Sequence, residues 1–212
     1  MDAEATKGER TRERILAATE PLILTRGFVG TSLEDILKAT GLTKGAFFNH
    51  FKGGKAELAR ALVERYARND YQLFAGFAAK ADAQSDDPLQ ATFIFLRLFE
   101  EFIENLPEPL HGCVFAAYTY EIQQFDPSIA AFIDASFRRW AALYEAKFAA
   151  VLAKYSPARP VTARALAEMI MAIIEGGFIL SRSHRDPMLV ARQSRQFRQY
   201  LELLFAGPAA AR

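Results

Sequence analysis

The residue types that most often carry catalysis are few and scattered in this sequence. Its three histidines, His50, His111 and His184, lie on separate segments with neither metal-ligand nor catalytic-triad spacing. Cys113 is the only cysteine, which excludes an intrachain disulfide and a cysteine-rich zinc site. The sequence has no Walker loop, dinucleotide-binding fingerprint or nucleophile elbow. We therefore expect no catalytic residues, no metal site and no cofactor.

Residues 31–51 indicate a different chemistry, the binding of nucleic acid. Their pattern predicts two short helices joined by a tight turn at Gly41, with Ser32 and Thr43 as N-caps. This is the spacing of a helix-turn-helix, although a simple helical hairpin has the same spacing. Apolar residues that can be buried between the helices are Leu33, Ile36, Leu37, Leu42, Phe47 and Phe51. Residues left facing outward on the second helix are Lys44, Gly45, Ala46, Phe48, Asn49 and His50.

An outward face of this composition suits the major groove of DNA. The positive end of the helix dipole favours phosphate, and the small residues Gly45 and Ala46 let the backbone approach closely. Lys44 supplies a cation at the start of the helix. Two simpler interpretations remain open: Lys44 as an ordinary solvated charge, and His50 as a side chain filling the interface with the following helix.

The elements that must position this segment are helices, with no sheet. Apolar residues recur at helical spacing along almost the whole chain. A first helix is expected over residues 9–27, and a long fourth helix after the Lys52-Gly53-Gly54 break. Asp-Pro pairs predict helix starts near residues 88, 127 and 187, and proline-containing breaks predict starts near 112 and 162. The predicted fold class is all-α with about nine helices.

Length and composition limit the class of protein. A chain of 212 residues with 51% apolar residues can form one large or two small domains with an ordinary core. The 26 basic and 25 acidic residues exclude a uniformly basic protein that coats nucleic acid. The polar start has no secretory signal, and no apolar run reaches the ~18 residues of a spanning helix. We expect a cytoplasmic protein without a membrane partner.

The N-terminal segment resembles the TetR family of transcriptional regulators. The resemblance runs from the first helix through Gly27-Phe28, Thr31-Ser32 and Ile36 to residues 40–51, and continues to Lys55 and Leu58. It implies a homodimer that binds palindromic double-stranded DNA. It also implies a helix-turn-helix domain over residues 1–55 and an effector-binding and dimerisation domain over residues 56–212.

The resemblance also implies roles for individual residues. Those at positions that contact the DNA backbone are Ser32, Thr43, Phe48, His50 and Lys55, and those that face base edges are Lys44, Gly45, Ala46 and Asn49. Two features depart from the family pattern. Phe48 stands where tyrosine is usual, so a phosphate-binding hydroxyl is missing and only apolar contact remains. The Lys52–Lys55 segment has one residue more than the commonest spacing, which affects the placement of Lys55.

The second domain is expected to bind a small apolar or aromatic effector and to form the dimer. Candidate effector-binding residues within the helices over about 88–180 are Phe102, Tyr118, Glu121, Trp140, Tyr144, Met171 and Glu175. For the two carboxylates, a hydrogen-bonded or solvent-facing role is the simpler alternative. Candidate dimer-interface residues are Leu166, Ile170, Ile173, Gly177, Leu180, Phe197, Leu201 and Leu204.

These features together predict a ligand-responsive DNA-binding regulator, a repressor that an effector releases from its operator. Two other classes were weighed against it. A small enzyme has only a possible Glu121–Glu175 carboxylate pair in its favour. An all-helical carrier of hydrophobic ligands explains the aromatic residues but not the pattern of residues 31–58.

Overall fold

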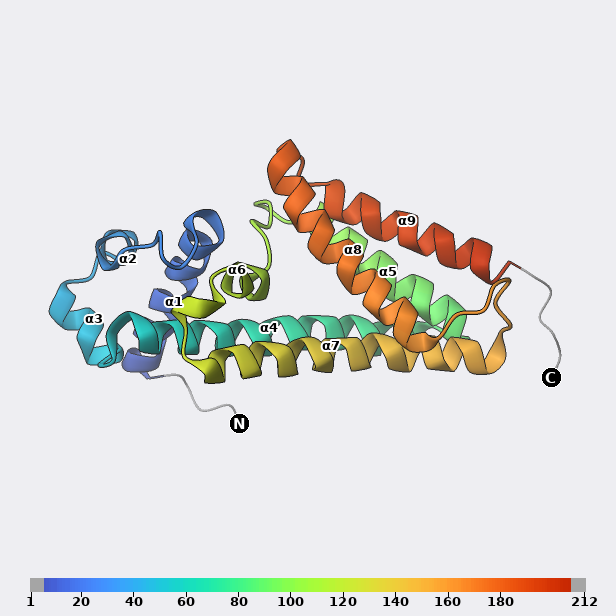
Figure 1. Cartoon of the computed structure of the whole chain (residues 1–212), viewed down its shortest axis with the longest axis horizontal. Coiled ribbons are helices and arrows are strands. Elements are labelled where there is room, and N and C mark those ends of the chain that lie inside the picture. The colour runs from blue at the N-terminus through green and yellow to red at the C-terminus, as the bar shows by residue number, and fades with distance from the viewer. Residues whose placement is uncertain (1–5, 207–212) are drawn as a thin grey trace. The chain divides into compact units, whose positions relative to one another are not determined.

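The computed structural model describes residues 6–206 and shows a helical protein (Figure 1). Over these residues there are nine α-helices, one 3-10 helix and no strand, so the predicted all-α class is confirmed. In chain order the elements are α1 (Lys7–Arg26), α2 (Leu33–Thr40), α3 (Lys44–His50), α4 (Gly54–Gln84), α5 (Pro88–Glu104), α6 (Val114–Tyr120), η1 (Ile122–Gln124), α7 (Pro127–Lys154), α8 (Ala163–His184) and α9 (Leu189–Leu204).

Capping residues begin the helices close to where the sequence predicts. The Thr43 hydroxyl accepts a hydrogen bond from the Ala46 amide at the start of α3. At the start of α5, the Asp87 carboxylate accepts from the Leu89 and Gln90 amides. Although burial by itself would raise it, hydrogen bonds from Lys154 and Tyr155 hold the pKa of Asp87 at about 2. The starts near 88 and 127 are confirmed, and α6, α8 and α9 begin within two residues of the predicted positions.

The chain divides into two compact units that are discontinuous in sequence. Unit one contains the residues up to Asn69 together with His111–Asp134. Unit two contains Asp70–Leu110 together with the residues from Ala135 onward. This division differs from a cut at residue 55, because the segment around α6 belongs with α1, α2, α3 and the first part of α4.

Unit one encloses a core that supports the helix-turn-helix. Ile15, Ile36, Phe47 and Phe51 are fully buried, and the rings of Phe47 and Phe51 stack at 5.4 Å. Tyr118 of α6 is also fully buried, and its hydroxyl donates to the Ala59 carbonyl at 3.2 Å. Because these contacts come from α1, α2, α3, α4 and α6, all five elements hold the short recognition helix in place.

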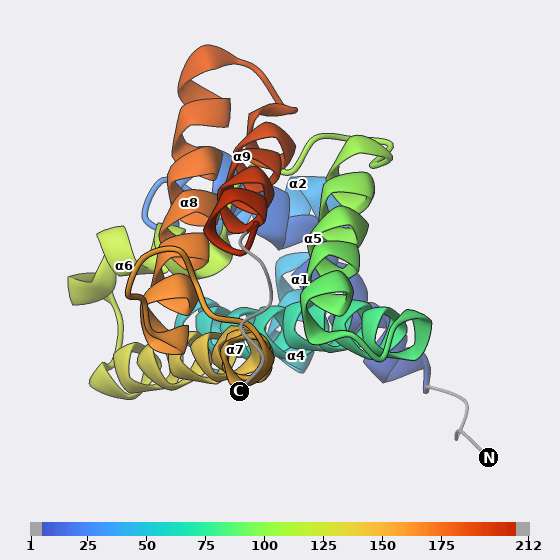
Figure 2. The same ribbon diagram turned by 90° about the vertical axis from the view of Figure 1, so that its right-hand side faces the viewer.

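Unit two is built around helices α5, α8 and α9, with α9 lying between the other two (Figure 2). Glu100 of α5 is buried, and its carboxylate accepts two hydrogen bonds from Arg198 of α9, both at 3.2 Å. Arg195 lies 3.6 Å from the same carboxylate and also pairs with Glu104. This ion-pair cluster joins α5 to α9 beside the apolar core.

Among the described residues, no helix combines the length and the apolar character that crossing a lipid bilayer requires.

Candidate nucleic-acid interface

The predicted helix-turn-helix is present in unit one. Helix α2 ends at Gly41, whose φ of 66° is the left-handed conformation that favours glycine, and α3 begins at Lys44. Ile36, Phe47 and Phe51 are fully buried, as expected of the inner faces. The other three predicted inner residues, Leu33, Leu37 and Leu42, are half-buried.

The outer face of α3 is open, small and cationic. Lys44, Gly45 and Asn49 are exposed, and a Cβ built at Gly45 would meet no atom within 4 Å. The Lys44 ammonium makes no ion pair with any residue that the structure describes. Nothing on this part of the molecule therefore competes with DNA for the side chain of Lys44 or for the α3 backbone.

The aromatic and imidazole side chains of α3 are less exposed than its start. Phe48 is 36% exposed and packs its edge against Phe47 at 5.4 Å. His50 is half-buried at the end of the helix, as is Ala46. Phe48 therefore keeps an accessible apolar surface at the position where a tyrosine hydroxyl would contact phosphate.

Ser32, predicted to contact DNA, is exposed and is also the N-cap of α2. Its hydroxyl donates to the Asp35 carboxylate at 2.6 Å and accepts from the Asp35 amide at 3.1 Å. These hydrogen bonds lower the pKa of Asp35, which also pairs with Arg26 at 2.9 Å. The sequence reasoning missed Asp35, although a Ser-x-x-Asp capping pattern could have indicated it.

The structure corrects the expected outward position of Lys55. Its ammonium donates to the Phe28 carbonyl at 2.5 Å and lies 4.2 Å from the centre of the Phe28 ring. Burial lowers the pKa of Lys55, and the nearby Glu121 carboxylate opposes this lowering. The side chain is turned toward the interior of unit one because it has three partners there: a carbonyl, an aromatic face and a carboxylate.

Two of the seven candidate effector residues, Tyr118 and Glu121, belong to unit one. Tyr118 stacks on Phe125 at 4.3 Å, with the rings inclined by only 2°. The Glu121 carboxylate accepts hydrogen bonds from the amides of Phe28 and Val29. The simpler interpretation of Glu121, a hydrogen-bonded carboxylate, is the one that the structure supports.

The other five candidates belong to unit two, where aromatic side chains cluster around Phe74. Trp140 and Tyr144 lie 5.7 and 6.2 Å from the Phe74 ring. Phe102 joins the cluster through Phe77, and Met171 packs against the same core. Burial raises the pKa of Tyr144, and the carboxylates of Asp70 and Glu175 raise it further. Sequence reasoning missed Asp70, which lies one helical turn before Phe74.

Most of the expected dimer-interface residues are core residues of a single chain, which corrects that assignment. Those buried within the chain are Leu166, Ile170, Gly177, Phe197, Leu201 and Leu204. A Cβ at Gly177 would lie 3.3 Å from the Val190 Cα, so this glycine permits close packing of α8 on α9 within one chain. Ile173 is partly buried, and only Leu180 of the expected set is exposed, at 43%.

A different apolar face of α8 is open. Met169, Ile179 and Leu180 are between 40% and 51% exposed, and a Cβ at Gly176 would meet nothing within 4 Å. Tyr200 and Leu203 of α9 are exposed as well. Met169, Gly176 and Leu180 recur at seven- and four-residue intervals, a helical stripe that could have been read from the sequence.

A helix-turn-helix with an open cationic face, joined to a second all-helical unit, defines a DNA-binding protein of the one-chain regulator class. Two family models match the chain: "Bacterial regulatory proteins, tetR family" over residues 15–62, and "Transcriptional regulator LmrA/YxaF-like, C-terminal domain" over residues 88–196. The chain belongs to the TetR family of transcriptional regulators. The resemblance expected from residues 27–58 is thereby confirmed.

Individual relatives agree with this assignment. The chain is 28% identical over 182 residues to the HTH-type transcriptional regulator LmrA of Bacillus subtilis, which covers 83% of this chain and 88% of that protein. A TetR regulator from Chloroflexus aurantiacus has a solved structure with a TM-score of 0.75 and 27% identity, covering 92% of this chain and 96% of that one. A regulator from Agrobacterium tumefaciens, 24% identical, has the same fold with a TM-score of 0.75 over 92% of this chain and 98% of its own.

The chain is thus a ligand-responsive, DNA-binding transcriptional regulator. Regulators of this family bind DNA and small-molecule effectors and form dimers. The curated relatives are transcriptional regulators and not enzymes.

Proposed function

We propose that the protein is a repressor that binds a palindromic operator as a homodimer and leaves it when a small apolar or aromatic effector binds. The observation that carries the proposal is the open face of α3, where Lys44, Gly45 and Asn49 are exposed. The curated relative named the transcriptional repressor NemR, from Escherichia coli, supports repression as the direction of control.

The proposed DNA-contacting residues lie on α3 and at the caps of α2 and α3. Lys44, Gly45, Ala46 and Asn49 would face base edges. Ser32, Thr43, Phe48 and His50 would meet the DNA backbone, with Phe48 also able to contact a thymine methyl. This set follows the family resemblance, and the exposure of these side chains supports it.

Selection of DNA fragments by the purified protein tests the proposal. The selected fragments should contain an inverted repeat, with half-site centres about 10 base pairs apart or a multiple of this. Lys44→Ala should then weaken operator binding. If Lys44 pairs with phosphate, the salt dependence of log K should flatten by about 0.9 for each contact, or about 1.8 for a dimer with two reading heads. The measurement is operator affinity at several salt concentrations.

Lys80→Ala is the matched control, because Lys80 is an exposed lysine of α4 in unit two. This variant should bind the operator like the wild-type protein. If Lys44→Ala folds normally and binds with unchanged affinity and salt dependence, α3 does not read the operator.

We place the dimer contact on the open apolar face of α8 with the exposed residues of α9. Met169, Gly176, Ile179 and Leu180 would meet their counterparts in a second copy, with Ile173 at the edge of the contact. The exposure of four large apolar side chains on α8 and α9 supports this, since soluble monomers rarely leave such residues together in water. Functionally, we keep residues 1–55 as the DNA-binding domain and residues 56–212 as the effector-binding and dimerisation domain.

The proposed effector site is the aromatic cluster of unit two, formed by Phe102, Trp140, Tyr144 and Met171. An apolar or aromatic ligand suits these side chains better than a sugar or nucleotide, which needs more polar partners. Glu175, whose charge acts on Tyr144, would accept a hydrogen bond from a ligand donor group. We further propose that the protein acts in the cytoplasm, where its operator is, and that it catalyses no reaction.

Trp140 makes the effector site testable, because it is the only tryptophan in the chain. Its indole lies among Phe74 and Phe137 in unit two, so a bound ligand should change its emission. A compound that releases the protein from its operator should shift this emission over the same concentration range. Trp140→Phe should abolish the signal and leave operator affinity nearly unchanged. A releasing compound that alters neither the emission nor the melting temperature would contradict this location.

A further inference from the structure

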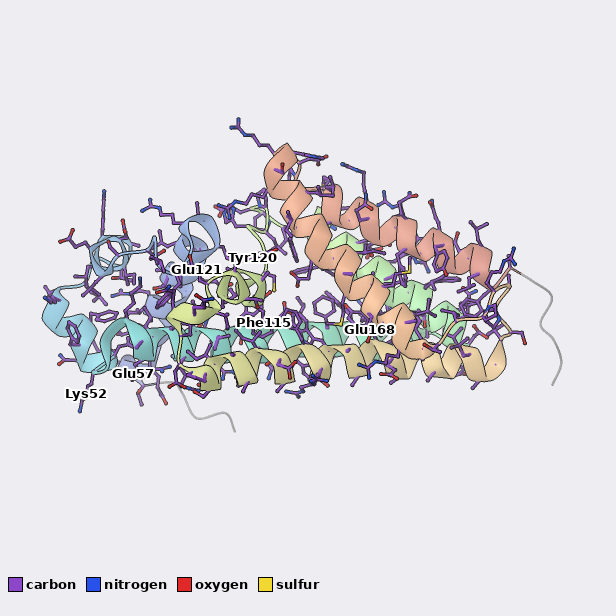
Figure 3. The ribbon with its side chains drawn as sticks, viewed as in Figure 1. Lys52, Glu57, Phe115, Tyr120, Glu121 and Glu168 are labelled. Atoms are coloured by element: carbon purple, nitrogen blue, oxygen red, sulfur yellow. The ribbon has the colours of Figure 1, made fainter. Side chains whose placement is uncertain are left out.

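The turn that connects α1 to α2 is held by a carboxylate from far along the chain. Oε2 of Glu121, just after α6, accepts hydrogen bonds from the amides of Phe28 at 2.8 Å and Val29 at 3.1 Å. Figure 3 labels Glu121 where the end of α6 lies beside α1. Glycine is required at position 27, because φ is +77° and a Cβ there would lie 2.3 Å from Oε1 of Glu121.

The same turn is held from its other side by Lys55 at the start of α4. The Lys55 ammonium donates to the Phe28 carbonyl, so both backbone polar groups of Phe28 are bound by charged side chains. Hydrogen bonds to an ionised group are about twice as strong as those between neutral groups. Glu121 and Lys55 therefore fix the backbone of Phe28 more firmly than neutral partners would.

Aromatic packing adds to this arrangement. The Phe28 ring is 8% exposed and lies 4.7 Å from the ring of Phe125 and 5.8 Å from that of Tyr118. These two rings flank Glu121 in sequence, so one short segment supplies both the carboxylate and the apolar surface beneath the turn. The turn leads directly into Ser32, the N-cap of α2.

From these contacts we infer that Glu121 is a positioning residue for operator recognition: it holds residues 27–29 and thereby fixes the orientation of the α2–α3 pair that meets DNA. The inference rests on the proposed function, since it requires that α2 and α3 bind an operator. Glu121 itself would not contact DNA. A displacement of the α6–η1 segment would reach the recognition helix through this carboxylate.

Amide hydrogen exchange tests the contact directly. In Glu121→Ala, the amides of Phe28 and Val29 should exchange faster than in the wild-type protein, because both lose their acceptor. Glu121→Gln keeps an acceptor oxygen and should retain part of the protection. Asp126→Ala is the matched control, since it removes a carboxylate of the same unit that caps α7. Saturating operator DNA should also slow exchange at Phe28 and Val29 in the wild-type protein, because coupling between two sites is reciprocal.

Operator affinity then separates positioning from simple charge effects by its sign. Removing a negative charge from a DNA-binding protein should by itself tighten binding. If Glu121 positions α2 and α3, Glu121→Ala should instead bind at least ~5-fold more weakly per folded molecule, the lower end of usual coupling between sites. Glu121→Gln should fall between the two, and Asp126→Ala should bind as tightly as the wild-type protein or more tightly.

Lys55→Met provides a second test of the same arrangement. If Lys55 supports the turn, its loss should weaken operator binding without changing the salt dependence. If its ammonium instead pairs with phosphate in the complex, the slope should fall by about 1.8 for the dimer. That second outcome would overturn the role given to Lys55.

The possible results distinguish this inference from the proposed function. Failure of the wild-type protein to select any operator would overturn the proposed function. Wild-type binding together with equally tight binding by folded Glu121→Ala would overturn the inference alone. If Glu121→Ala does not fold, Glu121→Gln carries the test, and wild-type affinity in that variant would likewise overturn the inference.

Discussion

Leu180→Arg should convert the dimer into a folded monomer and abolish tight operator binding. Leu180 is 43% exposed in the single chain, so arginine there should change the stability of the monomer by no more than about 0.5 kcal/mol. In a dimer joined through this face of α8, the charge would be buried without a partner. A loss of about 2 kcal/mol, typical of an interface hot spot, weakens association about 30-fold. Because the two reading heads then bind independently, operator affinity should fall by a further factor of ~100 or more.

Sedimentation over a range of concentrations measures the first effect, and a gel shift measures the second. Leu110→Arg is the matched control, since Leu110 is an equally exposed leucine, at 41%, outside α8 and α9. Gly176→Trp offers an independent variant, because the new side chain would extend into open space in the monomer but would obstruct a close approach of two α8 helices. A stable dimer in both variants would move the interface to another face.

Glu100→Ala should be the most destabilising single substitution outside the apolar core. The Glu100 side chain is 4% exposed, and its removal leaves Arg198, at 18% exposed, without its main partner. Breaking a buried ion pair from one side costs about 3 kcal/mol or more. For a chain of this length, that corresponds to a fall of roughly 6–12 °C in melting temperature.

Thermal and urea unfolding test this expectation, with Glu202→Ala as the control. Glu202 pairs with the same Arg198 at 3.1 Å, but it is 48% exposed and lies one turn away on α9. Solvent screens such a pair, so its loss should cost less than about 0.5 kcal/mol. Equal effects of the two substitutions would show that burial of Glu100 contributes nothing to the ion pair.

The local structure of the helix-turn-helix could be predicted from its sequence because each element is specified by nearby residues. Gly41 takes the left-handed conformation, Thr43 caps α3, and the alternation of apolar and polar residues decides which face of α3 is buried. The Asp-Pro pairs likewise mark the starts of α5 and α7. These signals act over three or four residues, the range within which helix caps and turns are determined.

Contacts between distant segments could not be predicted in this way. Nothing near Glu121 indicates that its partners are amides 92 and 93 positions away, and nothing near Lys55 indicates that its ammonium turns inward to Phe28. The dimer assignment failed for a related reason. Leu166, Ile170 and Phe197 have the spacing of an interface helix, but an apolar stripe does not reveal whether its partner is the same chain or another.

The support of the α1–α2 turn by Glu121 and Phe125 also limits how the reading head can be exchanged between proteins. A graft of the first 55 residues would carry both recognition helices but leave behind the carboxylate and the ring beneath the turn. A recombinant that keeps its specificity must therefore include residues 111–134 as a second insert. Gly27 and position 121 must also be exchanged together, because any larger residue at 27 collides with a glutamate at 121. The portable unit of DNA recognition in this chain is two separate stretches of sequence.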